Sequence, residues 1–199
     1  MLTIGLTGPT GSGKTTALAA LESLGCMCVD CDALYHELLE CSPALVEELT
    51  DRFGRSILNY QGKVDTKALA PVVFGDPQAL QDLNAIAHRH VLEACRERIQ
   101  EAKEAGRKGI VLDAIALLES GLGELCDVTV AVTAPEGVRL ERIMARDGLS
   151  REQALQRIAA QKPSEYYVNH CDHTIVNDGS KSYQDLQKEI NRLFADKLC

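Results

Sequence analysis

Short apolar runs alternate with amphipathic stretches along most of this 199-residue chain. The apolar runs have the length and the content of Val, Ile and Leu that are typical of buried strands. They cover residues 2–7, 26–30, 110–112, 128–132 and 174–176. The stretches between them repeat apolar residues at helical spacing, most clearly at residues 14–24, 33–39, 138–145 and 183–198. Strands that alternate with helices predict an α/β fold in which helices cover both faces of a parallel sheet.

Residues 43–106 break this alternation. They carry helical patterns but lack the apolar runs that further strands of the sheet would need. Turn sequences interrupt the helical pattern at residues 59–62 and 75–77. We therefore predict a helical insertion at the edge of the sheet.

Local signals place several helix ends. Gly25 follows the first helical stretch as a C-terminal cap glycine. Pro135 is expected in the first turn of a helix that begins near Thr133. That helix is expected to stop at Asp147-Gly148, and Ser150 with Gln153 predicts a capping box for the next one.

Residues Gly8 to Thr15 read Gly-Pro-Thr-Gly-Ser-Gly-Lys-Thr, a complete G-x-x-x-x-G-K-[ST] loop between the first strand and the first helix. Glycines let backbone N–H groups curl around a phosphate, and the positive end of the following helix faces the same anion. Lys14 can reach the β- and γ-phosphates, and the Thr15 hydroxyl can hold Mg²⁺. The loop predicts that a nucleoside triphosphate binds here, but it leaves the destination of the γ-phosphate open.

Composition narrows the class of protein further. The formal net charge of −8 argues against a nucleic-acid-binding surface, which needs a positive field. No apolar run is long enough to cross a bilayer, and the start of the chain does not look like a signal peptide. We expect a cytoplasmic protein without membrane or nucleic-acid partners. The oligomeric state is not predicted.

The eight cysteines leave two interpretations open. Cys26, Cys28 and Cys31 contain a C-x-x-C spacing, which is compatible with a metal or redox role, but the chain has no second C-x-x-C. The alternative is that Cys26 and Cys28 are small apolar residues of a buried strand. A cytosolic chain favours reduced thiols.

Aspartates follow two of the expected strands, at the sheet edge where ligands bind. Asp113 ends an apolar run and is a candidate Mg²⁺ ligand, although aspartate is also common in turns. Asp30 and Asp32 follow the second strand. Asp32 could accept a proton from an alcohol acceptor, as a kinase requires, or it could cap the helix that starts beside it.

Basic residues gather in one segment. Arg139, Arg142 and Arg146 share a helix face, and Arg146 precedes the Asp147-Gly148 break, so it could neutralise the transferred group from a mobile lid. The alternative is a solvated helix face with surface ion pairs. Arg157 and Gln161 lie one turn apart on the next helix and could belong to the same lid.

The order and spacing of these motifs resemble the dephospho-CoA kinase family nearly from end to end. The residues that carry the resemblance are the loop, residues 29–32, 42–45, 62–65 and 73–74, His88, Asp113, residues 119–122, 146–150, 157–161 and 176–179. The resemblance implies a P-loop kinase three-layer fold with a parallel five-stranded sheet. It also implies a nucleotide-binding core (about 1–32, 107–135 and 172–199), a helical CoA-binding insertion (about 33–106) and a helical lid (about 136–171).

The implied reaction moves the γ-phosphate of ATP, with Mg²⁺, to the 3′-hydroxyl of the ribose of dephospho-CoA. Asp32, Lys14 and Arg146 would be catalytic, and Thr15 and Asp113 would hold the metal. The implied ATP contacts are Gly8, Pro9, Thr10, Gly11, Ser12, Gly13, Lys14, Thr15, Thr16, Arg146 and Asn177. The implied acceptor contacts are Asp32, His88, Asp113, Leu117, Glu119, Arg157 and Gln161.

Three residues depart from the family pattern, all on the acceptor side. His36 stands where the family usually has arginine, Arg89 where it has proline, and Ile115 where it has another proline. We expect Arg89 to replace the missing cation. Two alternatives stay open: a nucleoside or nucleotide kinase on the same core, and a nucleotide-binding NTPase or regulator.

Overall fold

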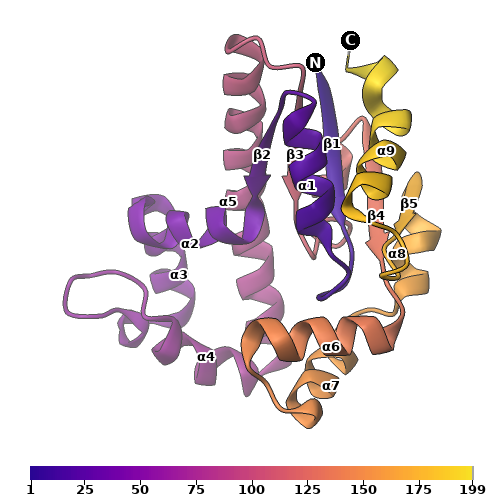
Figure 1. Ribbon diagram of the computed structural model, residues 1–199. Coiled ribbons are helices and arrows are strands. Elements are labelled where there is room, and N and C mark those ends of the chain that lie inside the picture. Colours follow the sequence, from indigo (N-terminus) through magenta and orange to yellow (C-terminus); the bar gives the residue numbers. More distant parts are fainter. Residues whose placement is uncertain (199) are drawn as a thin grey trace. The chain divides into compact units, whose positions relative to one another are not determined.

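The computed structural model describes residues 1–198 and divides into two compact units (Figure 1). The first unit contains Met1–Val29 and Ile99–Cys199, and the second contains Asp30–Arg98. The second unit falls within residues 33–106 except for its first three residues. Its separate compactness agrees with an inserted helical region.

The first unit is built on a five-stranded sheet in the order β2-β3-β1-β4-β5. Its strands are β1 (Leu2–Thr7), β2 (Cys26–Asp30), β3 (Gly109–Asp113), β4 (Val128–Thr133) and β5 (His173–Val176). The central strand β1 pairs in parallel with β3 and β4, and β4 pairs in parallel with β5. The α/β fold predicted from the alternating pattern is therefore confirmed, and the loop after β1 leaves the middle of the sheet.

Two helices cover one face of this sheet. Helix α1 (Lys14–Ser23) and helix α9 (Tyr183–Phe194) lie side by side there (Figure 1). They bury a shared core with inward-facing residues of the strands: Ile4, Leu6, Ala17, Ala20, Leu21, Val111, Val130, Val132, Ile175, Leu186, Ile190 and Phe194. Gly25 follows α1 with a φ of 92°, as expected of a C-terminal cap glycine. A short 3-10 helix, η3 (Ala195–Lys197), follows α9.

Side chains from the segment after β3 pack against the backbone of β1. A Cβ placed on Gly5 would lie 2.7 Å from a methyl of Leu117 and 2.9 Å from Sγ of Cys126. The 3-10 helix η2 (Leu122–Leu125) lies in this segment and contacts β1. A side chain at position 5 would therefore force Leu117 and Cys126 to shift.

The segment implied to be a lid contains α6 (Glu136–Asp147), α7 (Arg151–Ala159) and α8 (Ser164–His170). The capping box is confirmed, because Ser150 and Gln153 bond each other's backbone N–H groups. The expected helix start was wrong by one or two residues. Pro135 has an extended ψ of 146°, so it precedes the helix, which begins at Glu136. Helices α6 and α7 share a small core of Leu140, Ile143, Ala154 and Ile158.

The second unit is mainly helical, and Leu58 and Val64 form an isolated antiparallel bridge in it. It contains α2 (Cys31–Cys41), α3 (Pro43–Phe53), the 3-10 helix η1 (Arg55–Ile57), α4 (Thr66–Phe74) and most of α5 (Pro77–Glu104). Its core contains Leu39, Leu45, Leu49, Phe53, Ile57, Val64, Leu69, Val73, Ala79 and Ile86. The turn expected at residues 59–62 is present, with Asn59 Oδ1 accepting from the N–H groups of Gln61 and Lys63.

Candidate active site

The loop between β1 and α1 has the backbone shape of a phosphate cradle. Gly8, Gly11 and Gly13 have φ values of 138°, 80° and 91°, which L side chains rarely adopt. The turn is closed by the N–H of Ser12, which donates to the carbonyl O of Pro9 at 3.1 Å. Glycine supplies these conformations at no steric cost, so the sequence pattern and the geometry agree.

Two of these glycines are also fixed by close neighbours. A Cβ on Gly8 would lie 2.1 Å from the carbonyl O of Val132 in β4. A Cβ on Gly13 would lie 2.1 Å from Nδ2 of Asn177, which follows β5. The backbone of Val132 and the side chain of Asn177 therefore leave no space for a side chain at either end of the loop.

The polar side chains of the loop suit a bound polyphosphate. Nζ of Lys14 donates to the carbonyl O of Gly8 at 3.1 Å, so the ammonium lies back over the loop. The Ser12 hydroxyl is buried without a hydrogen-bond partner among the described residues, and a phosphate oxygen could supply that partner. The Thr15 side chain at the start of α1 is exposed.

Arg142 joins the loop to the segment after β5. Its Nη1 donates to the carbonyl oxygens of Gly11, Ser12 and Asn177 at 3.1–3.2 Å. Its Nη2 donates to Oδ1 of Asn177 at 3.1 Å. Asn177 itself is buried and its N–H bonds Thr133 at the end of β4. This arginine is a site residue that the sequence left undecided between a functional role and a solvated helix face.

A cavity of about 320 Å³ adjoins Arg142 and Asn177. It is lined by Gly13, Thr16, Arg142, Asn177, Lys181, Ser182, Tyr183 and Leu186. Thr16 and Asn177, both expected to contact ATP, thus line one cavity at the start of α1. The structure brings these two residues together with Gly13 of the loop.

Arg139 is the second arginine of α6 that contacts the loop. Its side chain is buried, and its Nε donates to the carbonyl O of Thr10 at 2.9 Å. Burial lowers the pKa of this guanidinium, and the Glu136 carboxylate opposes that shift. Gln161 bonds the same loop residue, since its Oε1 accepts from the N–H of Thr10 at 2.8 Å. The structure therefore puts Gln161 on the loop.

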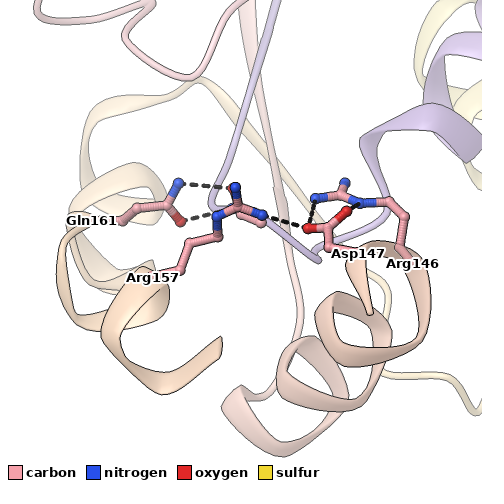
Figure 2. A network of polar contacts seen from close by, with 5 residues as sticks. Arg146, Asp147, Arg157 and Gln161 are labelled. Carbon is pink, nitrogen blue, oxygen red and sulfur yellow. Dashed lines mark hydrogen bonds and ion pairs between the residues drawn. The ribbon is translucent and has the colours of Figure 1, made fainter. Parts of the chain in front are cut away.

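Arg146 and Arg157 are both held by Asp147. The two carboxylate oxygens of Asp147 accept from Nε and Nη2 of Arg146 at 2.7 and 2.9 Å, and Oδ2 also accepts from Arg157. Figure 2 shows Asp147 between the two guanidinium groups, with Gln161 on the Arg157 side. The hydrogen bonds from Arg146 lower the pKa of the Asp147 carboxyl and raise that of Arg146. Two exposed cations expected in the lid are thus held next to each other.

The residues after β3 have different surroundings. Asp113 ends β3, opposite Leu6 of β1, at the same edge of the sheet as the loop. Glu119 is exposed and lies near the phenols of α8; burial first, and then this carboxylate, raise the pKa of Tyr166. Leu117 has no exposed surface and lies against Gly5, and its role as an acceptor contact stays a prediction.

The helix cap after β2 is Asp30. Its Oδ1 accepts from the N–H groups of Asp32 and Ala33 at 3.0 and 2.9 Å. Asp32 lies in the first turn of α2, and its side chain is exposed. The alternative in which Asp32 serves as the cap is therefore wrong, because Asp30 caps α2.

The histidines and Arg89 lie on α5 within the second unit. His88 is half-buried there. Arg89 forms an ion pair with Glu48, and Nε2 of His90 lies 2.9 Å from the other carboxylate oxygen of Glu48. These contacts lower the pKa of Glu48, with the Arg89 hydrogen bond as the first cause. Because Glu48 already neutralises Arg89, the structure does not favour Arg89 as the replacement for the arginine missing at His36.

The cysteine cluster is divided between two elements. Cys26 is buried in β2 as the apolar interpretation expects, and burial raises its pKa to about 11. Burial is also the main reason that the pKa of Cys28 rises to about 12. Cys31 belongs to α2, where its Sγ lies 3.7 Å from Sγ of Cys95. Among the described residues, no three His, Cys, Asp or Glu side chains form a group that could hold a metal ion.

Comparison with known sequences shows which family this chain resembles. The profile described as dephospho-CoA kinase (CoaE) matches residues 2–182. A dephospho-CoA kinase from Carboxydothermus hydrogenoformans is 40% identical over 177 residues, which is 89% of this chain and 86% of the relative.

The comparison with solved structures agrees with the comparison of sequences. The crystal structure of a Thermus thermophilus protein, TT1252, has a TM-score of 0.78 and 34% identity, covering 98% of this chain and 97% of the other. A dephospho-CoA kinase from Campylobacter jejuni has a TM-score of 0.68 and 26% identity, covering 98% and 96%. The similarity extends over both units.

Proposed function

The chain belongs to the dephospho-CoA kinase family, and from that premise we propose that it transfers the γ-phosphate of ATP to the 3′-hydroxyl of the ribose of dephospho-CoA. The products are coenzyme A and ADP. The observation that carries the proposal is the three-glycine phosphate cradle after the central strand, within a chain that matches the family over nearly its whole length.

The nucleotide side of the reaction rests on the loop and on α6. Backbone N–H groups of Gly13, Lys14 and Thr15 bind the phosphate oxygens, and the Lys14 side chain moves from the carbonyl of Gly8 to the β- and γ-phosphates. Asn177 and Thr16 line the adjoining cavity, which we assign to the nucleoside of ATP. Arg146 exchanges its bond to Asp147 for the transferred phosphoryl group, whose charge it neutralises.

The acceptor side rests on Asp32. Asp32 lies exposed in the first turn of α2, and in the proposed reaction its carboxylate accepts the proton of the 3′-hydroxyl. The hydroxyl oxygen then bonds to the γ-phosphorus as the bond from phosphorus to the β,γ-bridging oxygen breaks, and ADP leaves. His88, Asp113, Glu119 and Arg157 remain our proposed acceptor contacts.

Residues present in the chain fit a magnesium ion. The Thr15 hydroxyl is exposed at the start of α1, and Asp113 lies at the same edge of the sheet. Oxygen donors of this kind are the ligands that Mg²⁺ prefers, with substrate phosphates completing its shell. When bound, the ion neutralises charge on the β- and γ-phosphates.

No helix among the described residues is long and apolar enough to cross a membrane. The cytoplasmic location expected from the sequence remains part of the proposal.

An acceptor panel tests the proposed reaction. Purified protein is incubated with ATP, Mg²⁺ and one acceptor at a time: dephospho-CoA, adenosine or a nucleoside monophosphate. ADP release and product mass are followed together. The proposal expects ADP and a product of coenzyme A mass with dephospho-CoA alone. Turnover with adenosine or a monophosphate, and none with dephospho-CoA, would overturn it.

A further inference from the structure

Thr10, the third residue of the phosphate-binding loop, is bonded at all of its polar groups by the lid segment 136–171. Its N–H donates to Oε1 of Gln161 at 2.8 Å, and its hydroxyl accepts from Nε2 of the same side chain at 2.9 Å. Its carbonyl O accepts from Nε of Arg139 at 2.9 Å. A carboxamide that bonds both the N–H and the hydroxyl of one residue fixes the position of that residue, because one orientation alone makes both bonds.

The contact between Gln161 and Thr10 lies next to a buried arginine rather than on an isolated part of the surface. Arg139 is only 4% exposed, and its Nη2 lies 3.4 Å from Oε1 of Gln161. A buried guanidinium is tolerated only when its donors are satisfied, so the loop carbonyl and the Gln161 oxygen each stabilise the charge. Oε1 of Gln161 thus accepts from the loop and from the lid at the same time.

Gln161 is also anchored to the lid itself. Its N–H donates to the carbonyl O of Ile158 at 3.2 Å at the end of α7. The Ile158 side chain belongs to the small core that α6 and α7 share. A continuous path of contacts therefore leads from the lid core through Gln161 to the loop.

We infer that Gln161 is a positioning residue for ATP, which acts by holding Thr10 so that the loop from Gly11 to Lys14 keeps its cradle shape. This inference rests on the proposed function for the reaction that follows ATP binding. It assigns Gln161 to the nucleotide side of the site, whereas the family resemblance assigns it to the acceptor side.

A double-mutant cycle tests this inference. Gln161→Met keeps the length of the side chain and removes both bonds to Thr10, Thr10→Val removes the hydroxyl bond alone, and the double variant combines them. Gln156→Met is the matched control, because Gln156 is exposed on α7, which ends just before Gln161. The ATP dissociation constant is measured by titration calorimetry with Mg²⁺ and no acceptor. The KM values for ATP and for dephospho-CoA are measured separately.

We expect Gln161→Met to weaken ATP binding about tenfold, the scale of one or two lost hydrogen bonds, and to leave the KM for dephospho-CoA within about twofold. The double variant should be no weaker than Gln161→Met alone, because both changes act through the same contact. Gln156→Met should bind ATP like the wild type. If Gln161→Met does not fold, Gln161→Asn serves instead, because it keeps the carboxamide but is too short to reach Thr10.

Three results would overturn the inference: unchanged ATP affinity in Gln161→Met, additive effects in the double variant, or a raised KM for dephospho-CoA with unchanged ATP affinity. The last result would return Gln161 to the acceptor side. Since the calorimetry contains no acceptor, its result stands even if the chain fails to phosphorylate dephospho-CoA. Failure of the inference and failure of the proposed function are therefore separate outcomes.

Discussion

Replacing Gly8 with alanine tests the claim that packing against β4, as well as backbone freedom, requires glycine at the start of the loop. The added Cβ would lie 2.1 Å from the carbonyl O of Val132, a backbone atom that cannot rotate away. The φ of 138° adds strain of about 1–3 kcal/mol for any residue with a side chain. Overpacking against a strand adds about 1–3 kcal/mol more. We expect the free energy of unfolding to fall by roughly 2–6 kcal/mol, from about 5–15 kcal/mol for a typical domain.

Two control variants separate the two contributions. Gly106 has a φ of 64° and open space around it, so Gly106→Ala reports backbone strain alone, about 1–2 kcal/mol. Gly137 lies in α6 with open space and no positive φ, so Gly137→Ala should stay within about 1 kcal/mol of the wild type. Equilibrium unfolding in urea measures the free energy of unfolding of all three variants. If Gly8→Ala costs no more than Gly106→Ala, the contact with β4 is not what requires glycine, and the reasoning is refuted.

Three further predictions concern the chemistry of single side chains. Asp32→Asn should lower kcat by at least about a hundredfold, the usual contribution of a positioned base, and leave ATP affinity unchanged by calorimetry; near-normal turnover would contradict the assigned role. Lys14→Met should abolish transfer through lost charge stabilisation at the phosphates, measured as ADP release, and a rate near the wild-type value would count against it. Cys28, whose pKa is about 12, should be alkylated by iodoacetamide at pH 8 far more slowly than exposed Cys41, because the thiolate is the reactive form. Peptide mass spectrometry over time measures both rates, and equal rates would contradict the raised pKa of the half-buried Cys28.

Features encoded by neighbouring residues could be predicted from the sequence. The phosphate loop, the Ser150 capping box and the cap glycine Gly25 each depend on conformations within a few residues, so a local pattern specifies them. The apolar runs likewise predicted the strands, because a buried parallel strand needs apolar side chains on both faces.

Features that depend on residues far apart in the chain could not be predicted from the sequence. Helical spacing puts Arg139 and Arg142 on one face of α6, but it does not say that this face meets loop residues about 130 positions away. Two aspartates compete for the cap of α2, and the point where β2 ends decides in favour of Asp30. Leu117 matches a family motif, yet its burial against Gly5 follows from the packing of the segment after β3, which no local pattern shows.

The position of the transferred phosphate tests the central claim most directly. Product from ATP and dephospho-CoA is purified and examined by phosphorus NMR with coupling to the ribose protons. The account predicts one new phosphomonoester coupled to the 3′ proton, formed in equal amount with ADP. Inorganic phosphate in place of that ester, or an ester at the 2′ position, would contradict the account.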